Sequence, residues 1–257
     1  MITIDHLSYR SKLRYVNASE KFIYAVVTLV LCVASRSILV SLIVLALNAV
    51  LTLGLGGIPY PRYRKLMLIP LGFLILSTIA IIVNISKTPL DAYAFAVGSY
   101  YITGSRASLW LAARLILTAL ASVSCLYFLS LNTTMVDIQL VMHKMHFPML
   151  IREMMLLIYR FIFLLMAVSK NITTAQHSRL GNKDFKTSVR SFGTMVSVLL
   201  VLSVKRANEM YDAMESRCYE GNIRVLEENY APKTNEIMAI LLCESLLCVL
   251  SVCVRIY

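Results

Sequence analysis

The sequence predicts an all-α, polytopic membrane protein with about five transmembrane helices and two long amphipathic helices outside the bilayer. Of the 257 residues, 58% are hydrophobic and only 15% are charged, whereas a soluble domain has about 45–50% apolar and about 25% charged residues. The apolar residues also stand in long blocks, as expected where lipid is the solvent. Finally, about half of the lysines and arginines gather in one segment between two such blocks.

The net charge of +11 is explained by membrane topology. Lysine and arginine concentrate on the cytoplasmic side of membrane proteins. No pattern of interleaved aromatic and basic residues, of the kind that binds single-stranded nucleic acid, accompanies the charge. The six cysteines include no CxxC pair, so nothing supports a zinc or iron–sulfur site. We therefore expect no nucleic-acid partner, no bound metal and no cofactor.

The first two membrane spans are expected at 18–34 and at Ile38–Leu55. Asn17 is a candidate N-cap of the first, because Glu20 follows three residues later as at a typical helix start. The polar residues Ser35–Ser37 interrupt the apolar pattern. We interpret them as a tight turn between two helices.

Three further spans complete the predicted membrane domain. They are expected at Leu66–Ile85, Ala107–Leu131 and Ile237–Val254. The segment Gly56–Pro61 reads as a turn before the third span, because Gly and Pro punctuate local structure. Ser86–Arg106 follows the third span and is interpreted as a polar loop whose aromatic residues favour the membrane–water boundary.

Five crossings that begin inside the cell leave few basic residues outside, namely Arg36, Lys87, Arg106 and Arg255. This asymmetry follows the positive-inside rule and places the N-terminus in the cytoplasm. Glu244 lies in the middle of the last span. A carboxylate is costly in lipid, so we expect its side chain to face the protein interior.

The segment Asn132–Glu236 differs from the rest of the chain. It holds 13 of the 25 lysines and arginines, yet it also contains the apolar runs Met154–Val168 and Met195–Val204. Arg160 stands at the middle of the first run, where insertion into the bilayer would cost about 2.5–3.5 kcal/mol. The second run has only 10 residues, against about 20 needed for a span.

Two long amphipathic helices at the cytoplasmic face, about 150–180 and about 187–218, account for this segment better than two more spans. If both runs crossed the membrane, the basic residues between them would face outside, against the positive-inside rule. The predicted organisation is therefore membrane helices with a basic N-terminus in 1–131, a cytoplasmic helical domain in 132–236, and the final span in 237–257.

The order of these segments, together with three local stretches, resembles the transmembrane T component of energy-coupling factor (ECF) transporters. The similarity covers nearly the whole chain and is to the cobalt-type branch, the CbiQ family. The three stretches are Ile4–Tyr9 continuing through Arg14–Lys21, then Phe147–Phe163, and then Ala207–Arg217. The resemblance implies that the two cytoplasmic helices are long, crossed coupling helices.

Members of that family carry a pair of Ala-Arg-Gly-like motifs, one at the end of each coupling helix. The matching stretches here are Ser178-Arg179-Leu180 and Ser216-Arg217-Cys218. Both depart from the motif at the flanking positions, and both keep the arginine. The resemblance implies that Arg179 and Arg217 dock in grooves of two ATP-binding-cassette subunits, and that a separate membrane subunit binds the substrate.

The residues alone allow a simpler interpretation of the first motif. Gly181 suits the left-handed position just after a helix, which would place Arg179 in the last turn. A cation there favourably balances the helix dipole by about 0.3–1 kcal/mol. Arginine is also the better cation for docking, because its planar group can bind a carboxylate through two hydrogen bonds. Both interpretations remain open at this point.

Signatures of catalysis are missing from the sequence. It has no GxxxxGK[ST] loop, no GxSxG and no HExxH, so we expect a non-catalytic protein. His143 and His146 could share a helix face and could bind cobalt, nickel or zinc. No third ligand stands near them in the sequence, and we do not count them as a metal site.

The resemblance implies a coupling subunit of an ATP-driven ECF importer in the cell membrane of a prokaryote, with cobalt ions as the substrate. A nickel or vitamin importer of the same type is the alternative. A stand-alone permease is the next alternative, and it would need polar groups along a path through the bilayer. The candidates for such a path are few: Asn48, Asn84, Arg114 and Glu244. A membrane-embedded enzyme is the third.

Overall fold

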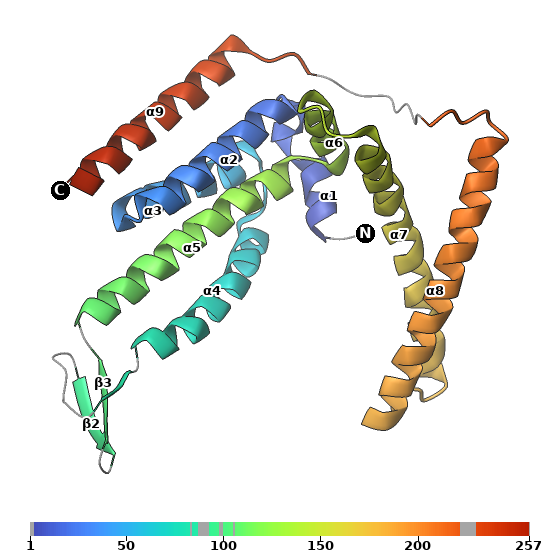
Figure 1. The fold of residues 1–257 in the computed structure, drawn as a ribbon, viewed down its shortest axis with the longest axis horizontal. Helices are drawn as coiled ribbons and strands as arrows, with labels where there is room; N and C mark the ends of the chain where they lie inside the picture. Colours follow the sequence, from blue (N-terminus) through green and yellow to red (C-terminus); the bar gives the residue numbers. More distant parts are fainter. Residues whose placement is uncertain are drawn as a thin grey trace. The chain divides into compact units, whose positions relative to one another are not determined.

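A computed structural model describes residues 3–82, 84–86, 93–97, 100–104, 106–221 and 230–256. The chain divides into two compact units. One unit, here called the bundle, comprises residues 2–141 and 229–257, and the other, the hairpin unit, comprises residues 142–228. Figure 1 shows helices throughout both units, in agreement with the predicted all-α membrane protein.

The first part of the bundle consists of helices α1 (Thr3–Arg10), η1 (Lys12–Tyr15), α2 (Ala18–Ser35), α3 (Ile38–Val50) and η2 (Leu51–Leu55). The predicted N-cap is confirmed, because the Asn17 side chain accepts a hydrogen bond from Ser19 N at 2.9 Å. The predicted tight turn is confirmed as well. Arg36 adopts φ of 47° between α2 and α3, and this left-handed residue reverses the chain direction.

The remaining helices of the bundle are α4 (Tyr60–Ile82), α5 (Arg106–Asn132) and α9 (Thr234–Ile256). A shorter helix, α6 (Met135–Lys144), follows α5 and was not predicted separately. Pro70 lies inside α4, as expected for a membrane helix that tolerates a proline. Arg62, Arg64 and Lys65 lie in the first turns of α4, directly after the predicted turn.

The segment predicted as a polar loop contains a small antiparallel sheet. Its strands are β1 (Asn84–Ser86), β2 (Tyr93–Val97) and β3 (Tyr100–Gly104), in the order β1-β3-β2. Ile102 pairs with Ile85 on one side and with Phe95 on the other. The strands are rich in aromatic and β-branched residues, which favour extended structure. Lys87, which was expected outside the cell, is not among the described residues.

Helices α2, α3 and α5 pack against one another and form the centre of the bundle (Figure 1). A fully buried cluster joins them, with α9 contributing one residue: Cys32, Val40, Val44, Ala121, Cys125 and Leu247. Most of these side chains are small. Small side chains let helix backbones approach closely, which is how membrane helices associate without a hydrophobic driving force.

Several polar side chains inside the bundle form hydrogen bonds with one another. Tyr24 donates to Asn48 Oδ1 at 3.1 Å, and Asn48 Nδ2 donates to Ser124 Oγ at 3.1 Å. Thr28 donates to Glu244 Oε1 at 3.0 Å. This contact between α2 and α9 confirms that Glu244 faces the protein interior.

One end of the bundle, here called the basal end, joins the N-terminal segment to the termini of several helices. Ser11 Oγ donates to Asn132 Oδ1 at 2.7 Å. The buried ammonium of Lys21 donates to Leu13 O at 3.1 Å and to Asn132 O at 2.9 Å. The N-terminal segment is thereby held against the last residue of α5.

The same end also gathers the turn before α4 and the start of α9. Lys12 N donates to Gly56 O at 3.2 Å, and Asn17 Nδ2 donates to Tyr230 O at 2.7 Å. The helices of the bundle therefore start and stop at this end in alternation, as the expected series of crossings requires.

Among the described residues, five helices are long and apolar enough to cross a membrane: Ala18–Ser35, Ile38–Leu55, Arg106–Asn132, Phe185–Glu215 and Thr234–Cys253. Four of them match predicted spans. The fifth is in the segment expected in the cytoplasm, whereas α4 is not among the five. The stretch 66–82 of α4 nevertheless carries no charged residue.

The hairpin unit consists of two long helices, α7 (Met149–Ser178) and α8 (Phe185–Glu215). Both helices were predicted, with ends that differ by up to three residues. They run antiparallel (Figure 1), and neither contains a buried residue. Their apolar side chains, such as Phe185, Phe192 and Leu200, are instead exposed.

A first prediction concerns the turn at the basal end. A Cβ added to Gly56 would lie 2.5 Å from both Asn132 Oδ1 and Thr52 O, so Gly56→Ala forces the turn away from α5. We expect a loss of about 1–3 kcal/mol in stability, measured as a lower melting temperature of the detergent-solubilised chain. Gly54→Ala is the matched control, because nothing lies within 4 Å of a Cβ there. Equal melting temperatures for the two variants would contradict this account.

Candidate functional site

The first predicted motif, Ser178-Arg179-Leu180, forms the C-terminal cap of α7. Leu180 N donates to His177 O at 3.1 Å, and Gly181 N donates to Gln176 O at 2.8 Å. Leu180 has φ of 57°. These two bonds and one left-handed residue make a Schellman cap. Arg179 is the C-cap residue of the helix.

The second predicted motif forms the same kind of cap at the end of α8. Cys218 N donates to Glu215 O at 3.0 Å, Tyr219 N donates to Met214 O at 3.1 Å, and Cys218 has φ of 58°. Arg217 therefore occupies the same position in its cap as the arginine of the first motif. The structure gives the two stretches one geometry, although only the arginine and the preceding serine are shared.

The expectation that Gly181 takes the left-handed position is wrong by one residue. Leu180 is the left-handed residue, and Gly181 follows it. Gly181 is required for a different reason, because a Cβ there would lie 2.9 Å from Gln176 O and 3.0 Å from Ser191 Oγ. The glycine lets the chain pass close to both helices.

This geometry explains the glycine in Ala-Arg-Gly-like motifs. The third position of the motif is the left-handed residue of the cap, where glycine carries no steric cost. In this chain Leu180 and Cys218 occupy that position. A side chain in this conformation costs roughly 1–2 kcal/mol, and the chain keeps the cap in spite of that cost.

Both arginines are exposed at the helix ends. Neither Arg179 nor Arg217 forms an ion pair within the described residues. Leu180, beside Arg179, is 70% exposed. Each helix end therefore offers a free guanidinium group on a well-defined cap, and the first adds an exposed apolar side chain.

The two arginines lie at opposite ends of the hairpin. Arg179 follows α7, in the turn between the helices, and Arg217 follows α8, which runs back along α7 (Figure 1). Helix α8 has 31 residues, which corresponds to a length of about 46 Å. The length of α8 therefore separates the two caps.

Side chains fix the hairpin at the turn. Gln176 Nε2 donates to Ser191 O at 2.7 Å, and Ser191 Oγ donates to Gly181 O at 2.9 Å. One turn further along, Thr173 Oγ1 contacts Met195 Sδ at 3.5 Å. These bonds between α7 and α8 hold the first motif in a fixed orientation.

A different contact holds the far end. Tyr219 donates a hydrogen bond to Glu153 Oε2 at 2.7 Å and so links the end of α8 to the start of α7. This bond to a carboxylate raises the pKa of Tyr219, so the hydroxyl remains a donor. Beside it lies a cavity of about 600 Å³ whose lining includes Arg160 and Arg217.

Acidic residues near the second motif lie on the surface. Arg206 Nη1 lies 2.9 Å from Glu209 Oε2, three residues further along the helix, and both side chains are about half exposed. Such an exposed pair contributes only about 0.2–1 kcal/mol. The pair lies on the surface of α8 and does not involve Arg179 or Arg217.

The histidine pair considered for metal binding does not share a helix face. Helix α6 ends at Lys144, and His146 follows it with φ of 58°. The spacing rule for helices therefore does not apply to His143 and His146. No group of three or more metal-ligating side chains occurs within the described residues.

The polar residues considered for a transport path are engaged in packing. Asn48 is fully buried and hydrogen-bonded to Tyr24, Ser124 and Cys125. Glu244 accepts from Thr28. Arg114 is half-buried in α5, and the side chain of Asn84 lies outside the described part. The described members of this set do not line one route.

The family model described as "Cobalt transport protein", CbiQ, matches residues 10–227. This match includes both caps and most of the bundle. The chain belongs to the CbiQ family. The CbiQ match confirms the resemblance drawn from the sequence, and it establishes a cobalt transport component with several apolar helices suited to a multi-pass membrane protein.

Three relatives support the assignment to CbiQ. The cobalt transport protein CbiQ of Salmonella typhimurium is 28% identical over 226 residues, which cover 88% of this chain and all of that protein. An uncharacterized protein of Methanocaldococcus jannaschii is 30% identical over 96% of this chain and 92% of its own. A putative fused cobalt transport protein CbiMQ of Methanocorpusculum labreanum is 28% identical over 88% of this chain and 38% of its own.

The caps generate a second prediction. Leu180→Gly and Cys218→Gly should each stabilise the local cap by about 1 kcal/mol, because glycine removes the cost of the left-handed conformation. The measurement is hydrogen–deuterium exchange of the Gly181 and Tyr219 amides, each of which donates to the carbonyl five residues earlier in its cap. We expect slower exchange by about fivefold.

Leu180→Ala is the matched control for the first cap, because alanine removes most of the side chain but keeps the Cβ. If Leu180→Ala slowed exchange as much as Leu180→Gly, backbone strain would not be the cause.

Proposed function

We propose that this chain is the transmembrane coupling subunit of an ATP-driven ECF importer. The observation that carries the proposal is the pair of identically capped helix ends, each with an exposed arginine, at opposite ends of one hairpin. Arg179 and Arg217 would bind two ATP-binding-cassette subunits. The chain itself would transmit motion and perform no chemistry.

The separation of the two caps supports a partner with two copies of one groove. When ATP binding closes the two ATPase subunits, their grooves move relative to each other, and the two caps move with them. An arginine can form two parallel hydrogen bonds to a carboxylate. Because the caps are fixed by backbone bonds, little of that displacement is lost before it reaches the helices.

The basal end of the bundle supports a cytoplasmic location for its N-terminus. Basic residues gather there, namely Arg10, Lys12, Arg14, Arg62, Arg64 and Lys65. The turn at the opposite end, between α2 and α3, carries Arg36. The positive-inside rule then assigns the basal end to the cytoplasm. The chain leaves the bundle after Val141 and returns at Tyr230, both near this end.

Helix α8 is apolar enough to span a membrane by composition, yet its pairing favours the cytoplasm. It runs beside α7, which carries the exposed Arg160 at its middle. The turn between them carries Arg179 and Lys183, which a membrane-spanning hairpin would place outside. In this proposal the exposed apolar side chains of α7 and α8 contact partner subunits.

Cobalt is the proposed substrate because two of the relatives described above are named for cobalt transport. The fused relative also indicates a second membrane component, since this chain matches only 38% of it. That component would bind the substrate. Asn48 and Glu244, two of the polar residues considered for a path, are hydrogen-bonded to neighbouring helices of the bundle, which argues against transport by this chain alone.

A third prediction tests the docking role. Replacing both Arg179 and Arg217 with Glu reverses the charge at the two caps, so ATPase subunits should no longer co-purify with the chain and cobalt uptake should fall to background. The measurement is co-purification from cells that express all subunits, together with uptake of radioactive cobalt.

Lys170→Glu with Arg190→Glu is the matched control, because both residues are exposed within the helices and away from the caps. This control should retain the complex and uptake. Unchanged complex and uptake in the Arg179 and Arg217 variant would remove the docking claim.

A fourth prediction tests the topology. In a chain whose exposed Cys218, Cys248 and Cys253 are serine, a Leu180→Cys substitution should react with a membrane-impermeant thiol reagent only after the cells are opened. Leu180 is 70% exposed, so burial would not explain protection in intact cells.

Arg36→Cys is the control, because this exposed turn between α2 and α3 should react in intact cells. Labelling at position 180 in intact cells would place the hairpin outside and refute the proposed function.

A further inference from the structure

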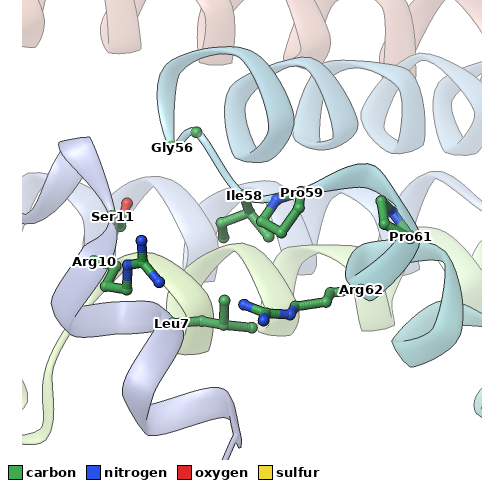
Figure 2. Close-up of a pocket in the computed structure, with 9 residues that line it drawn as sticks. Leu7, Arg10, Ser11, Gly56, Ile58, Pro59, Pro61 and Arg62 are labelled. Carbon is green, nitrogen blue, oxygen red and sulfur yellow. The ribbon is translucent and has the colours of Figure 1, made fainter.

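A pocket at the basal end of the bundle belongs neither to the helix caps nor to the interior of the bundle. It encloses about 470 Å³ between the N-terminal segment and the turn that precedes α4. Leu7 and Ile58, both nearly fully buried, belong to its lining. Figure 2 shows Arg10 and Arg62 reaching into this space from opposite sides.

The two arginines give the pocket a concentrated positive charge. Neither Arg10 nor Arg62 forms an ion pair within the part of the chain that the structure describes. Two nearby arginines instead stack on aromatic rings. Arg14 stacks on Tyr9 with 5.2 Å to the ring centroid, and Arg64 stacks on Tyr60 with 5.8 Å. The two pocket arginines therefore remain available to an anion.

The shape of the turn keeps the pocket open. Gly57 has φ of 67°, and a Cβ at Gly56 would collide with Asn132. The Gly-Gly turn is followed by Pro59 and Pro61, which restrict the backbone. The turn thus sets the shape of the lining, and the two arginines are the charged groups in it.

The chemistry of two converging guanidinium groups fits a phosphate ester. Arginine binds phosphate oxygens through paired hydrogen bonds. A carboxylate would match a single arginine, whereas a phosphate offers enough oxygens for both. A phosphate could arrive as a lipid headgroup or as a soluble ion.

The surface of α4 identifies the lipid as the source. Immediately beyond Arg62, this helix exposes a continuous apolar surface: Leu68, Ile69, Phe73 and Leu76 are 62–71% exposed. The half-exposed Tyr60 lies at its start, where aromatic residues favour the membrane interface. A headgroup in the pocket would have its acyl chains along this surface of α4.

We infer that the pocket between Arg10 and Arg62 binds the phosphate of an anionic membrane lipid. The bound lipid would bridge the N-terminal segment and the start of α4. The inference needs α4 to lie in lipid, but it is independent of any ATPase contact. It adds a specific lipid site to a chain whose proposed function requires only a bilayer.

The test uses the full-length chain in a neutral detergent. Its melting temperature is followed while dioctanoyl-phosphatidylglycerol is added, with dioctanoyl-phosphatidylcholine and inorganic phosphate in parallel. We expect a saturable rise with phosphatidylglycerol. In the Arg10→Gln/Arg62→Gln variant the half-saturating concentration should increase by about tenfold or more, because each arginine contributes to binding of anionic lipid.

The matched control is Arg14→Gln/Arg64→Gln, which removes the same charge from neighbouring positions outside the pocket. It should keep the half-saturating concentration within about threefold of the unaltered chain. If the glutamine variant of the pocket does not fold, Arg10→Lys/Arg62→Lys retains the charge and removes the paired hydrogen bonds. That variant should still weaken lipid binding relative to the control.

Three outcomes would overturn the inference. Equal weakening in the pocket and control variants would show diffuse attraction to the basic surface instead of a site. An unchanged response in the pocket variant would remove the role of the two arginines. The same rise with inorganic phosphate at the same concentration would identify a soluble phosphate ligand in place of a lipid.

Discussion

The buried ammonium of Lys21 is the interaction on which the basal end depends. It is 3% exposed and donates to backbone carbonyls of two separate segments, at Leu13 and Asn132. A cation at the last carbonyl of α5 is also favoured by the helix dipole. Breaking a buried contact of this kind leaves unpaired polar groups, which is more costly than the contact is worth by itself. The Lys21 ammonium thereby holds Asn132, the last residue of α5, in place.

In the proposed function, the hairpin unit transmits a displacement although its two described helices have no buried residue. Its described helices have no buried residue, and they are held by contacts at the two ends. These contacts hold both caps in position, and the proposed coupling would shift the two helices against each other between them. A shift of packed helices against each other is one of the known forms of conformational switching. The caps supply the rigid points that such a switch requires.

The sequence was sufficient for the helices, because long apolar blocks and the Asn17 cap are local signals. It was sufficient for the two arginines only through the family motif. It misplaced the left-handed residue, because glycine preference pointed to Gly181, whereas the hydrogen bonds of the cap require Leu180 there. The small sheet was missed because the aromatic residues near Tyr100 fit a membrane boundary as well as a strand. The pocket of Arg10 and Arg62 joins residues 52 positions apart, which no local pattern reveals.

The absence of burial in α7 and α8 has a thermodynamic consequence. In the proposed function partner subunits cover their apolar surface, so the ordering of the hairpin and its assembly are linked equilibria. An association constant measured with the isolated chain would then include the free energy of ordering the helices. The heat capacity change on assembly would exceed the value expected for two preformed surfaces. Calorimetry of the complex would separate the ordering of the helices from the contact between the surfaces.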